Sequence, residues 1–373
     1  MSEEHEKHSA WKVRKSEALI VILLILGYIN FRFINHNEIL MIILGLTLGV
    51  WLAFRPSEWA VEGLENTAAY MGLSAYMVGV ISSLASNTPE AVISGLTAVR
   101  GFTTGNAAML DIAVISVLTA VGFNIMILGI MIAITIKKYG KVKIHKDVIE
   151  KDSELMTWTF IVLLIIFSLG VMEMIGSLRA GIPEEKFSLS PWISAILVIS
   201  YITYIIFVYQ GQEEKGIAKP HFSKRLGYTL AIAGFAGIFM GGEIITSSIE
   251  TMLESIDLSQ YGNPVILISL IIGLAGTVPE HGIAITAAHK GKVDISIGNL
   301  MGGILQVILL VLGGIGMFVP IPLDKYVMFQ LMVSGGVILF LKSTIVDDGH
   351  LDAFEGIMMI ILQLVVFITM IIE

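Results

Sequence analysis

Long runs of apolar residues, separated by short polar segments, make up most of the chain. The runs 19–29 and 161–172 contain no charged residue, and a helix needs about 20 mostly apolar residues to cross a bilayer. The same pattern predicts spans near 17–34, 38–70, 76–99, 107–136, 155–178, 191–210, 226–255, 264–289, 294–319, 327–342 and 353–372. We therefore expect an all-α polytopic membrane protein with about 11 transmembrane helices. The spans 38–70 and 226–255 are longer than a membrane requires, so we expect them to be tilted.

The composition supports a membrane protein and excludes several other classes. Hydrophobic residues make up 55% and charged residues 14% of the chain, whereas soluble proteins carry about 25% charged residues. The net charge of −8 comes without a basic stripe, which argues against nucleic acid as a partner. The absence of cysteine excludes disulfides and thiolate metal sites. No HExxH motif and no triad-like grouping of Ser and His is present, so we do not expect an enzyme.

The distribution of Lys and Arg predicts how the spans are oriented. With the eleven spans above, 17 of these residues fall on the side of the N-terminus and four on the opposite side. Cytoplasmic loops carry the excess of positive charge. We therefore expect a multi-pass protein, most simply of the cell membrane, with a cytoplasmic N-terminus and a C-terminus outside.

Two segments of the chain resemble each other and divide it into repeats. ASNTPEAVISGLTAVRG (85–101) is similar to AGTVPEHGIAITAAHKG (275–291), and an Asp-Ile pair opens the next span in both copies. The repeats are five spans each, 38–210 and 226–373, with a cytoplasmic linker at 211–225; residues 1–37 hold a tail and an extra helix. An odd number of crossings makes the repeats inverted, and matching broken helices in inverted repeats indicate the midplane site of a transporter.

The Pro-Glu pair in each copy predicts a site for a hard cation. Pro89 and Pro279 have no N–H, so the carbonyl groups four residues earlier lose their helical partners. Glu90 and Glu280 follow the two prolines directly. Because a carboxylate within a membrane span is energetically costly, its presence there indicates a functional site. Carboxylate and carbonyl oxygens favour Ca²⁺ and leave Mg²⁺ and Mn²⁺ open. Because two empty carboxylates are expensive to close off within the membrane, switching of access should require one Ca²⁺ or two monovalent ions, which indicates antiport.

These motifs, at about 76–129 and 264–313, resemble the two α-repeats of the cation/Ca²⁺ exchanger superfamily, which contains Na⁺/Ca²⁺ and H⁺/Ca²⁺ antiporters. The resemblance implies a ten-helix fold in which 38–70 and 226–255 slide to alternate access. It also implies that Glu90 and Glu280 are the central Ca²⁺ ligands and that the backbone carbonyls of Ser86 and Gly276 coordinate the ion as well.

The motifs combine features of sodium-coupled and proton-coupled exchangers. Asn87 and Thr277 stand where sodium exchangers carry a serine-type hydroxyl, and Asn124 matches a family asparagine. The second copy instead is similar to proton exchangers through Glu280-His281 and Gln306, whereas the prolines are sodium-exchanger-like. We favour H⁺ coupling and keep Na⁺ coupling as the alternative. His281 is then a candidate proton relay or, equally, a structural histidine.

The predicted ligands are Glu90, Glu280, Ser86, Gly276, Asn87, Thr277, Asn124 and Gln306. We expect a divalent cation, a monovalent counter-ion and the lipid bilayer as partners, no resident cofactor, and leave the oligomeric state open. A passive cation channel is the alternative from another class, because its selectivity ring also uses acids and carbonyls.

Overall fold

The computed structural model describes residues 13–73, 75–139, 142–143, 146–180, 188–210, 219–289 and 293–372. The helices are α1 (Lys15–Phe33), α2 (Glu38–Tyr70), α3 (Ala75–Ser86), α4 (Thr88–Thr104), α5 (Ala107–Tyr139), α6 (Lys146–Ala180), α7 (Pro191–Gln210), α8 (Lys224–Ser255), α9 (Pro264–His289), α10 (Val293–Gln306), α11 (Gly313–Phe318), α12 (Lys325–Asp348) and α13 (Ala353–Ile372). A 3₁₀ helix, η2 (Ser259–Tyr261), and a π-helix, η3 (Val307–Leu312), complete them. The strands are β1 (Val142–Lys143), β2 (Ser188–Leu189), β3 (Ile321–Pro322) and β4 (His350–Leu351).

The predicted spans and the observed helices agree closely. Nine of the eleven predicted spans are single helices, 76–99 is divided between α3 and α4, and 294–319 contains α10, η3 and α11. Within the part of the chain that is described, eight helices are long and apolar enough to cross a membrane. The all-α polytopic class is therefore confirmed, and the two long spans are helices of 33 and 32 residues, α2 and α8.

The chain folds into two compact units that do not coincide with the sequence repeats. The first unit contains Met1–Ile93 and Glu213–Ile256, and the second contains Ser94–Gln212 and Asp257–Glu373. The first unit therefore holds the first helix of each repeat, α2 and α8, whereas the second unit holds the last three spans of each. The bounds of the repeats themselves stay a sequence prediction.

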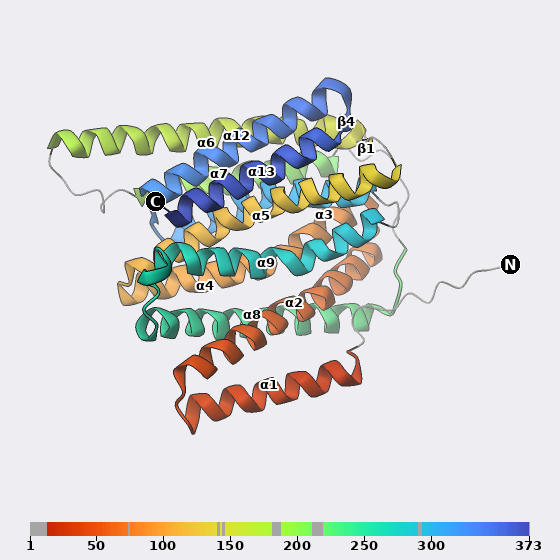
Figure 1. Cartoon of the computed structure of the whole chain (residues 1–373). Helices are drawn as coiled ribbons and strands as arrows, with labels where there is room; N and C mark the ends of the chain where they lie inside the picture. The colour runs from red at the N-terminus through yellow and green to blue at the C-terminus, as the bar shows by residue number, and fades with distance from the viewer. Residues whose placement is uncertain are drawn as a thin grey trace. The chain divides into compact units, whose positions relative to one another are not determined.

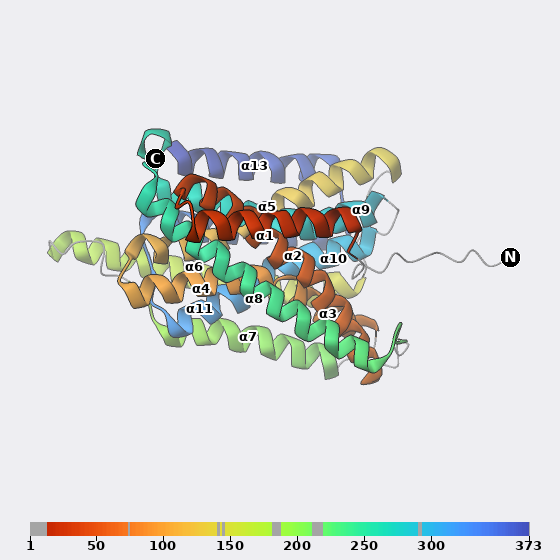
Figure 2. The ribbon, with the colours of Figure 1, turned by 90° about the horizontal axis from the view of Figure 1, so that it is seen from below.

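In the first unit, α2 and α8 pack through small residues along their whole length (Figures 1 and 2). A Cβ atom built on Gly63 would lie 2.5 Å from the backbone nitrogen of Ala231, and one built on Gly241 would lie 2.5 Å from that of Ala53. Positions early in α2 thus meet positions late in α8, so the helices are antiparallel. Small residues let two backbones approach closely in a membrane, where apolar burial gives no preference for protein over lipid.

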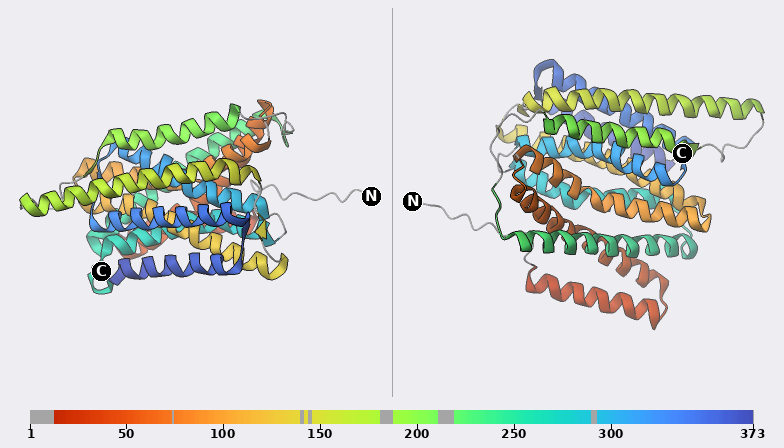
Figure 3. Two further views of the ribbon diagram at one scale, coloured as in Figure 1. Left: turned by 90° about the horizontal axis from the view of Figure 1, so that it is seen from above. Right: turned by 180° about the vertical axis from the view of Figure 1, so that it is seen from behind.

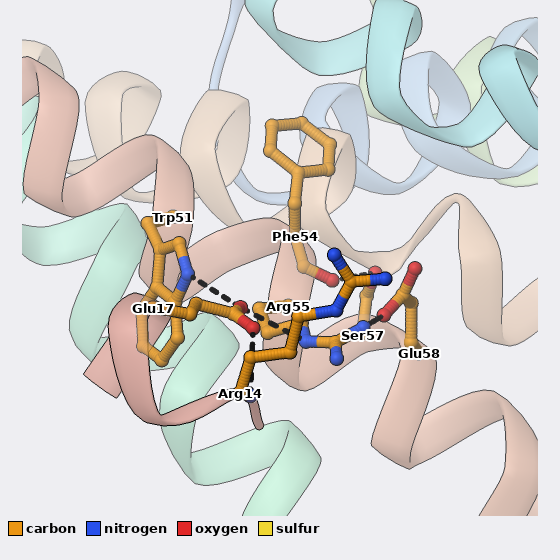
Figure 4. Close-up of polar contacts among 7 residues, drawn as sticks. All are labelled: Arg14, Glu17, Trp51, Phe54, Arg55, Ser57 and Glu58. Atoms are coloured by element: carbon orange, nitrogen blue, oxygen red, sulfur yellow. Dashed lines mark hydrogen bonds and ion pairs between the residues drawn. The ribbon is translucent and has the colours of Figure 1, made fainter. Parts of the chain in front are cut away.

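The extra helix α1 is fastened to the first helices of both repeats. Its apolar contacts centre on Val21 and Tyr28 against Leu48 of α2. Near its start, the carboxylate of Glu17 accepts a hydrogen bond from Trp51 and forms an ion pair with Arg55, which also pairs with Glu58 (Figure 4). At its other end, Arg32 donates to the hydroxyl of Ser247 on α8 at 3.1 Å.

Two short sheets in the second unit show that the repeats are inverted. β1 pairs with β4, which lies beside it in Figure 1, and β2 pairs with β3; both pairs are antiparallel. β1 and β3 each follow the third span of their repeat, whereas β2 and β4 each lie between the fourth and fifth spans. Because α6 and α12 separate the two positions, the sheets lie at opposite ends of these helices. The third spans of the two repeats therefore end on opposite sides, as the sequence predicts.

In the second unit, helices of one repeat pack against helices of the other repeat. α6 packs against α12, α5 against α13 and α11 against α7, so the third span of each repeat meets the fifth span of the other (Figure 3). Glycines carry both reciprocal contacts: Gly129 faces Gly356 of α13, and Gly313 faces Ser194 of α7. The glycine-rich segment 313–318 thus serves close helix packing.

Gly63→Ala should destabilise the protein because the added methyl group meets two backbone atoms, the nitrogen of Ala231 and the carbonyl oxygen of Gly227. Overpacking of this kind costs about 1–3 kcal/mol. The measurement is the thermal unfolding midpoint in detergent. Gly336→Ala is the matched control, because a Cβ there has no atom within 4 Å. Equal midpoints for the two variants would contradict the close α2–α8 contact.

Candidate functional site

The first Pro-Glu pair lies where the helix is interrupted between α3 and α4 at Asn87. The carbonyl oxygen of Ser83 accepts three hydrogen bonds, from the backbone N–H of Asn87 at 3.2 Å, its side-chain amide at 3.0 Å and the hydroxyl of Ser86 at 2.9 Å. The hydroxyl of Thr88 donates to the carbonyl of Leu84 at 3.1 Å. Polar side chains thus share carbonyl acceptors with the helical ladder just before Pro89, where the helix is interrupted.

Glu90 occupies the first turn of α4 and is buried, with 5% of its surface exposed. Among the described residues, neither carboxylate oxygen has a hydrogen-bond partner. A buried carboxylate without a partner is unstable unless a proton or a cation neutralises it. The beginning of a helix offers partial positive charge, but it does not replace a cation. Glu90 is therefore placed to bind one.

The second Pro-Glu pair differs from the first in its backbone. α9 continues from Pro264 to His289 without interruption, so the predicted break at Pro279 is wrong. Here the hydroxyl of Thr277 donates to the carbonyl of Gly273 within the same helix at 2.8 Å, and Val278 has no polar group with which to compete. A proline removes one hydrogen bond from the ladder, and α9 continues across that loss.

Gly276 and Thr277 are both buried in α9. The side chains of Glu280 and His281 lie outside the residues whose side chains are described, so their predicted roles stay predictions.

Asn124 lies in the middle of α5 with 0% of its surface exposed. Neither its amide oxygen nor its amide nitrogen has a hydrogen-bond partner among the described residues. α5 packs against α9. Ser269 of α9 bonds Ile112 of α5, and Gly273, one turn later in α9, contacts Ala120, which is also later in α5. The two helices thus run in the same direction. One turn beyond the contact of Gly273 with Ala120, Asn124 and Thr277 come to the same level.

Gln306, which is buried with 3% exposed, ends α10 directly before the π-helix η3. π-Helical turns are rare, carry an extra residue per turn and are frequent at functional sites. α10 contacts both α5 and α9, the helices of Asn124 and Thr277. The second unit therefore holds Asn124, Thr277 and Gln306 on three helices that contact one another, together with Gly276 and Glu280 on α9, whereas Ser86, Asn87 and Glu90 lie in the first unit.

The sequence pattern missed two features of this region. The π-helix has no signal in a uniformly apolar stretch, VILLVL. Four buried hydroxyl groups on α4, α5 and α9 were also passed over: Ser94, Ser116, Thr119 and Ser269. A lone Ser or Thr in an apolar span is a weak signal, because its hydroxyl can bond a carbonyl of its own helix.

The predicted ligands whose side chains are described offer hard oxygens: the carboxylate of Glu90 and the amide of Asn87 in the first unit, and the amides of Asn124 and Gln306 and the hydroxyl of Thr277 in the second. Such donors suit Ca²⁺, Mg²⁺ or Mn²⁺ rather than metals that prefer thiolate or imidazole. Within the described residues, no group of three His, Cys, Asp or Glu residues forms a metal cluster.

A family model for sodium/calcium exchanger proteins matches residues 37–210 and 226–372. This match covers most of the chain, which therefore belongs to the sodium/calcium exchanger protein family.

Individual relatives are more distant. A Ca²⁺/H⁺ antiporter of Synechocystis sp. is 30% identical over 146 residues, which is 38% of this chain and only 37% of that protein. The crystal structure of the H⁺/Ca²⁺ exchanger CAX aligns with a TM-score of 0.71 and 16% identity over 96% of this chain and 93% of that one. The sodium-calcium exchanger NCX_Mj aligns with a TM-score of 0.58 and 18% identity over 87% and 96%. At these identities the two structures share the fold with this chain.

Asn124→Leu tests whether the buried amide lines a cation site. Removing an unpaired amide should stabilise the protein without Ca²⁺, because such a group costs about 1–3 kcal/mol to bury. The same change should reduce the upward shift of the unfolding midpoint that Ca²⁺ produces. Thermal unfolding with and without Ca²⁺ measures both. An asparagine that only bonds a neighbouring helix would instead destabilise the Ca²⁺-free protein when replaced.

Proposed function

We propose that the chain is a secondary active antiporter that exchanges Ca²⁺ for H⁺ by alternating access. The observation that carries the proposal is the buried carboxylate of Glu90, which has no hydrogen-bond partner among the described residues. In a membrane such a group needs a cation or a proton in every state that is closed to water. Two ions that compete for one neutralising role are exchanged and do not flow independently.

Each predicted ligand has a role in this proposal. Glu90 and Glu280 supply charge, the backbone carbonyls of Ser86 and Gly276 supply oxygens next to them, and the remaining oxygens come from side chains: Asn87, Thr277, Asn124 and Gln306. Six to eight oxygens are typical of Ca²⁺. His281, next to Glu280, is the candidate proton relay.

H⁺ is favoured over Na⁺ as the counter-ion by two observations. The relative from Synechocystis carries the name of a Ca²⁺/H⁺ antiporter. In addition, Asn87 stands in the first copy in place of one of the paired serine-type hydroxyls expected of a sodium exchanger, whereas Thr277 keeps a hydroxyl in the second. Na⁺ coupling, Mg²⁺ or Mn²⁺ as the cargo, and a passive channel are the competing outcomes of the transport experiment.

The experiment is Ca²⁺ uptake into proteoliposomes with a pH gradient in one arm and a Na⁺ gradient in the other. Uptake driven only by the pH gradient supports the proposal. Uptake driven only by the Na⁺ gradient contradicts H⁺ as the counter-ion and assigns that role to Na⁺. Ca²⁺ flux that needs no counter-ion indicates a channel. If Ca²⁺ moves in neither arm but Mg²⁺ or Mn²⁺ does, Ca²⁺ is not the transported ion.

In the same assay, Glu90→Gln and Glu280→Gln should each abolish exchange, because an amide neither attracts a divalent cation nor carries a proton away. Glu173→Gln is the matched control, since Glu173 is exposed on α6. Near-normal exchange by either site variant, with a folded protein, would remove that glutamate from the site.

The absence of cysteine from the chain allows its orientation to be read by single-cysteine labelling. Lys219→Cys and Lys325→Cys replace exposed residues that the Lys and Arg pattern assigns to opposite sides. With intact cells, a membrane-impermeant maleimide should label position 325 and spare position 219 until the membrane is opened. The reverse result would invert the proposed topology.

A further inference from the structure

Four buried hydroxyl groups of the second unit form what we call the hydroxyl clamp. Its members lie on three helices and have between 0% and 3% of their surface exposed: Ser94 on α4, Ser116 and Thr119 on α5, and Ser269 on α9. These three helices carry Glu90, Asn124 and Glu280 in that order.

The bonds of the clamp cross from helix to helix. The hydroxyl of Thr119 is shared between the carbonyl oxygen of Ser269 at 3.1 Å and that of Ser116 in its own helix at 3.0 Å, and the hydroxyl of Ser269 returns a bond to the carbonyl of Ile112 at 3.4 Å. One turn before Thr119 on α5, the hydroxyl of Ser116 lies 3.3 Å from that of Ser94 on α4. α5 is thereby tied to α9 by two bonds in opposite directions and to the second part of α4 by one.

The clamp lies where α5 and α9 are in close contact. A Cβ atom on Gly273 would collide with the hydroxyl of Thr119 and would lie 3.1 Å from the backbone nitrogen of Ala120. A side chain at position 273 would therefore push the helices apart and stretch the bonds of the clamp. The close approach and the hydrogen bonds thus depend on each other.

A second buried threonine of α5 differs from Thr119 in the bond that is described for it. Thr135, farther along α5, has 2% of its surface exposed, and the bond described for its hydroxyl goes to Met131 in its own helix. Between Asn124 and Thr135, the buried face of α5 is apolar, with Ile125, Leu128 and Met131. The cross-helix hydroxyls are therefore concentrated on one side of Asn124 and are not a general feature of α5.

The clamp lies close enough to the predicted ligands to fix their register. Thr119 precedes Asn124 by about 7 Å along α5, and Ser269 precedes Thr277 by about 12 Å along α9, at a rise of 1.5 Å per residue. Both helices run in the same direction from the clamp towards these residues. A slip or rotation of α9 against α5 would therefore move Thr277 away from the level of Asn124.

We propose that Thr119 and Ser269 are positioning residues, which hold α5 and α9 in the register that the cation site needs. This inference rests on the proposed function, because it concerns the same Ca²⁺ site. Oxygen ligands bind Ca²⁺ at about 2.3–2.6 Å, so a shift of the helices by a fraction of an ångström weakens binding before it unfolds the protein. Neither residue touches the ion.

The test compares the apparent KM for Ca²⁺ in pH-driven uptake by proteoliposomes. Thr119→Val keeps the shape of the side chain and removes its hydrogen bond, and Ser269→Ala removes the return bond. Each should raise the KM about threefold, the equivalent of one interhelical hydrogen bond in a membrane, with a smaller change in the maximal rate. Thr119→Ser, which keeps the hydroxyl, should restore the wild-type KM. Thr135→Val is the matched control and should leave it unchanged.

The clamp is contradicted if Thr119→Val and Ser269→Ala keep the wild-type KM, or if they lower only the maximal rate or the unfolding temperature. It is also contradicted if Thr119→Ser fails to restore the KM. Should Thr119→Val not fold, Ser269→Ala decides the question alone, because it changes a different hydrogen bond. A wild-type protein that moves no Ca²⁺ contradicts the proposed function instead, and the two failures are distinguished by the wild-type and Thr135→Val measurements.

Discussion

The carboxylate of Glu90 is the constraint on which this account depends. It is buried in an apolar span with no hydrogen-bond partner among the described residues, and such a group must be neutralised by something that comes and goes. Around it, Asn87 and Ser86 direct their hydrogen bonds to Ser83 and interrupt the helix. A strong buried charge thus lies directly after an interruption of the helix.

Elsewhere in the fold, the helices are packed together mainly through small and apolar residues, with few polar contacts. Glycine and alanine bring α2 close to α8, and glycines again mediate the contacts of α5 with α13 and of α11 with α7. The two small sheets show the inversion of the repeats through their strand order. In this setting a few hydroxyls carry the specific contacts, which is why Thr119 and Ser269 matter more than their weak sequence signal suggests.

Most of the fold could be predicted from the sequence because membrane helices follow directly from apolar length, and the repeat motif located Glu90 and Asn124. The prediction failed at the second Pro-Glu motif, because the helix is interrupted at the first motif and continues through the second. Pro89 lies beside Asn87 and Thr88, whose side chains compete with the ladder, whereas Pro279 lies beside Val278 and α9 continues. The π-helix after Gln306 and the cross-helix bonds of Ser269 depend on packing against other helices, which no local pattern encodes.

The central claim is that Ca²⁺ and protons neutralise the same carboxylates. It is tested most directly by counting the protons released when Ca²⁺ binds to the purified protein in weakly buffered detergent solution. The account predicts release of up to about two protons per Ca²⁺, since ligands must lose their protons to bind a metal, and loss of that release in the Glu90→Gln, Glu280→Gln double variant. Binding of Ca²⁺ without release of protons across the acidic and neutral pH range would contradict it.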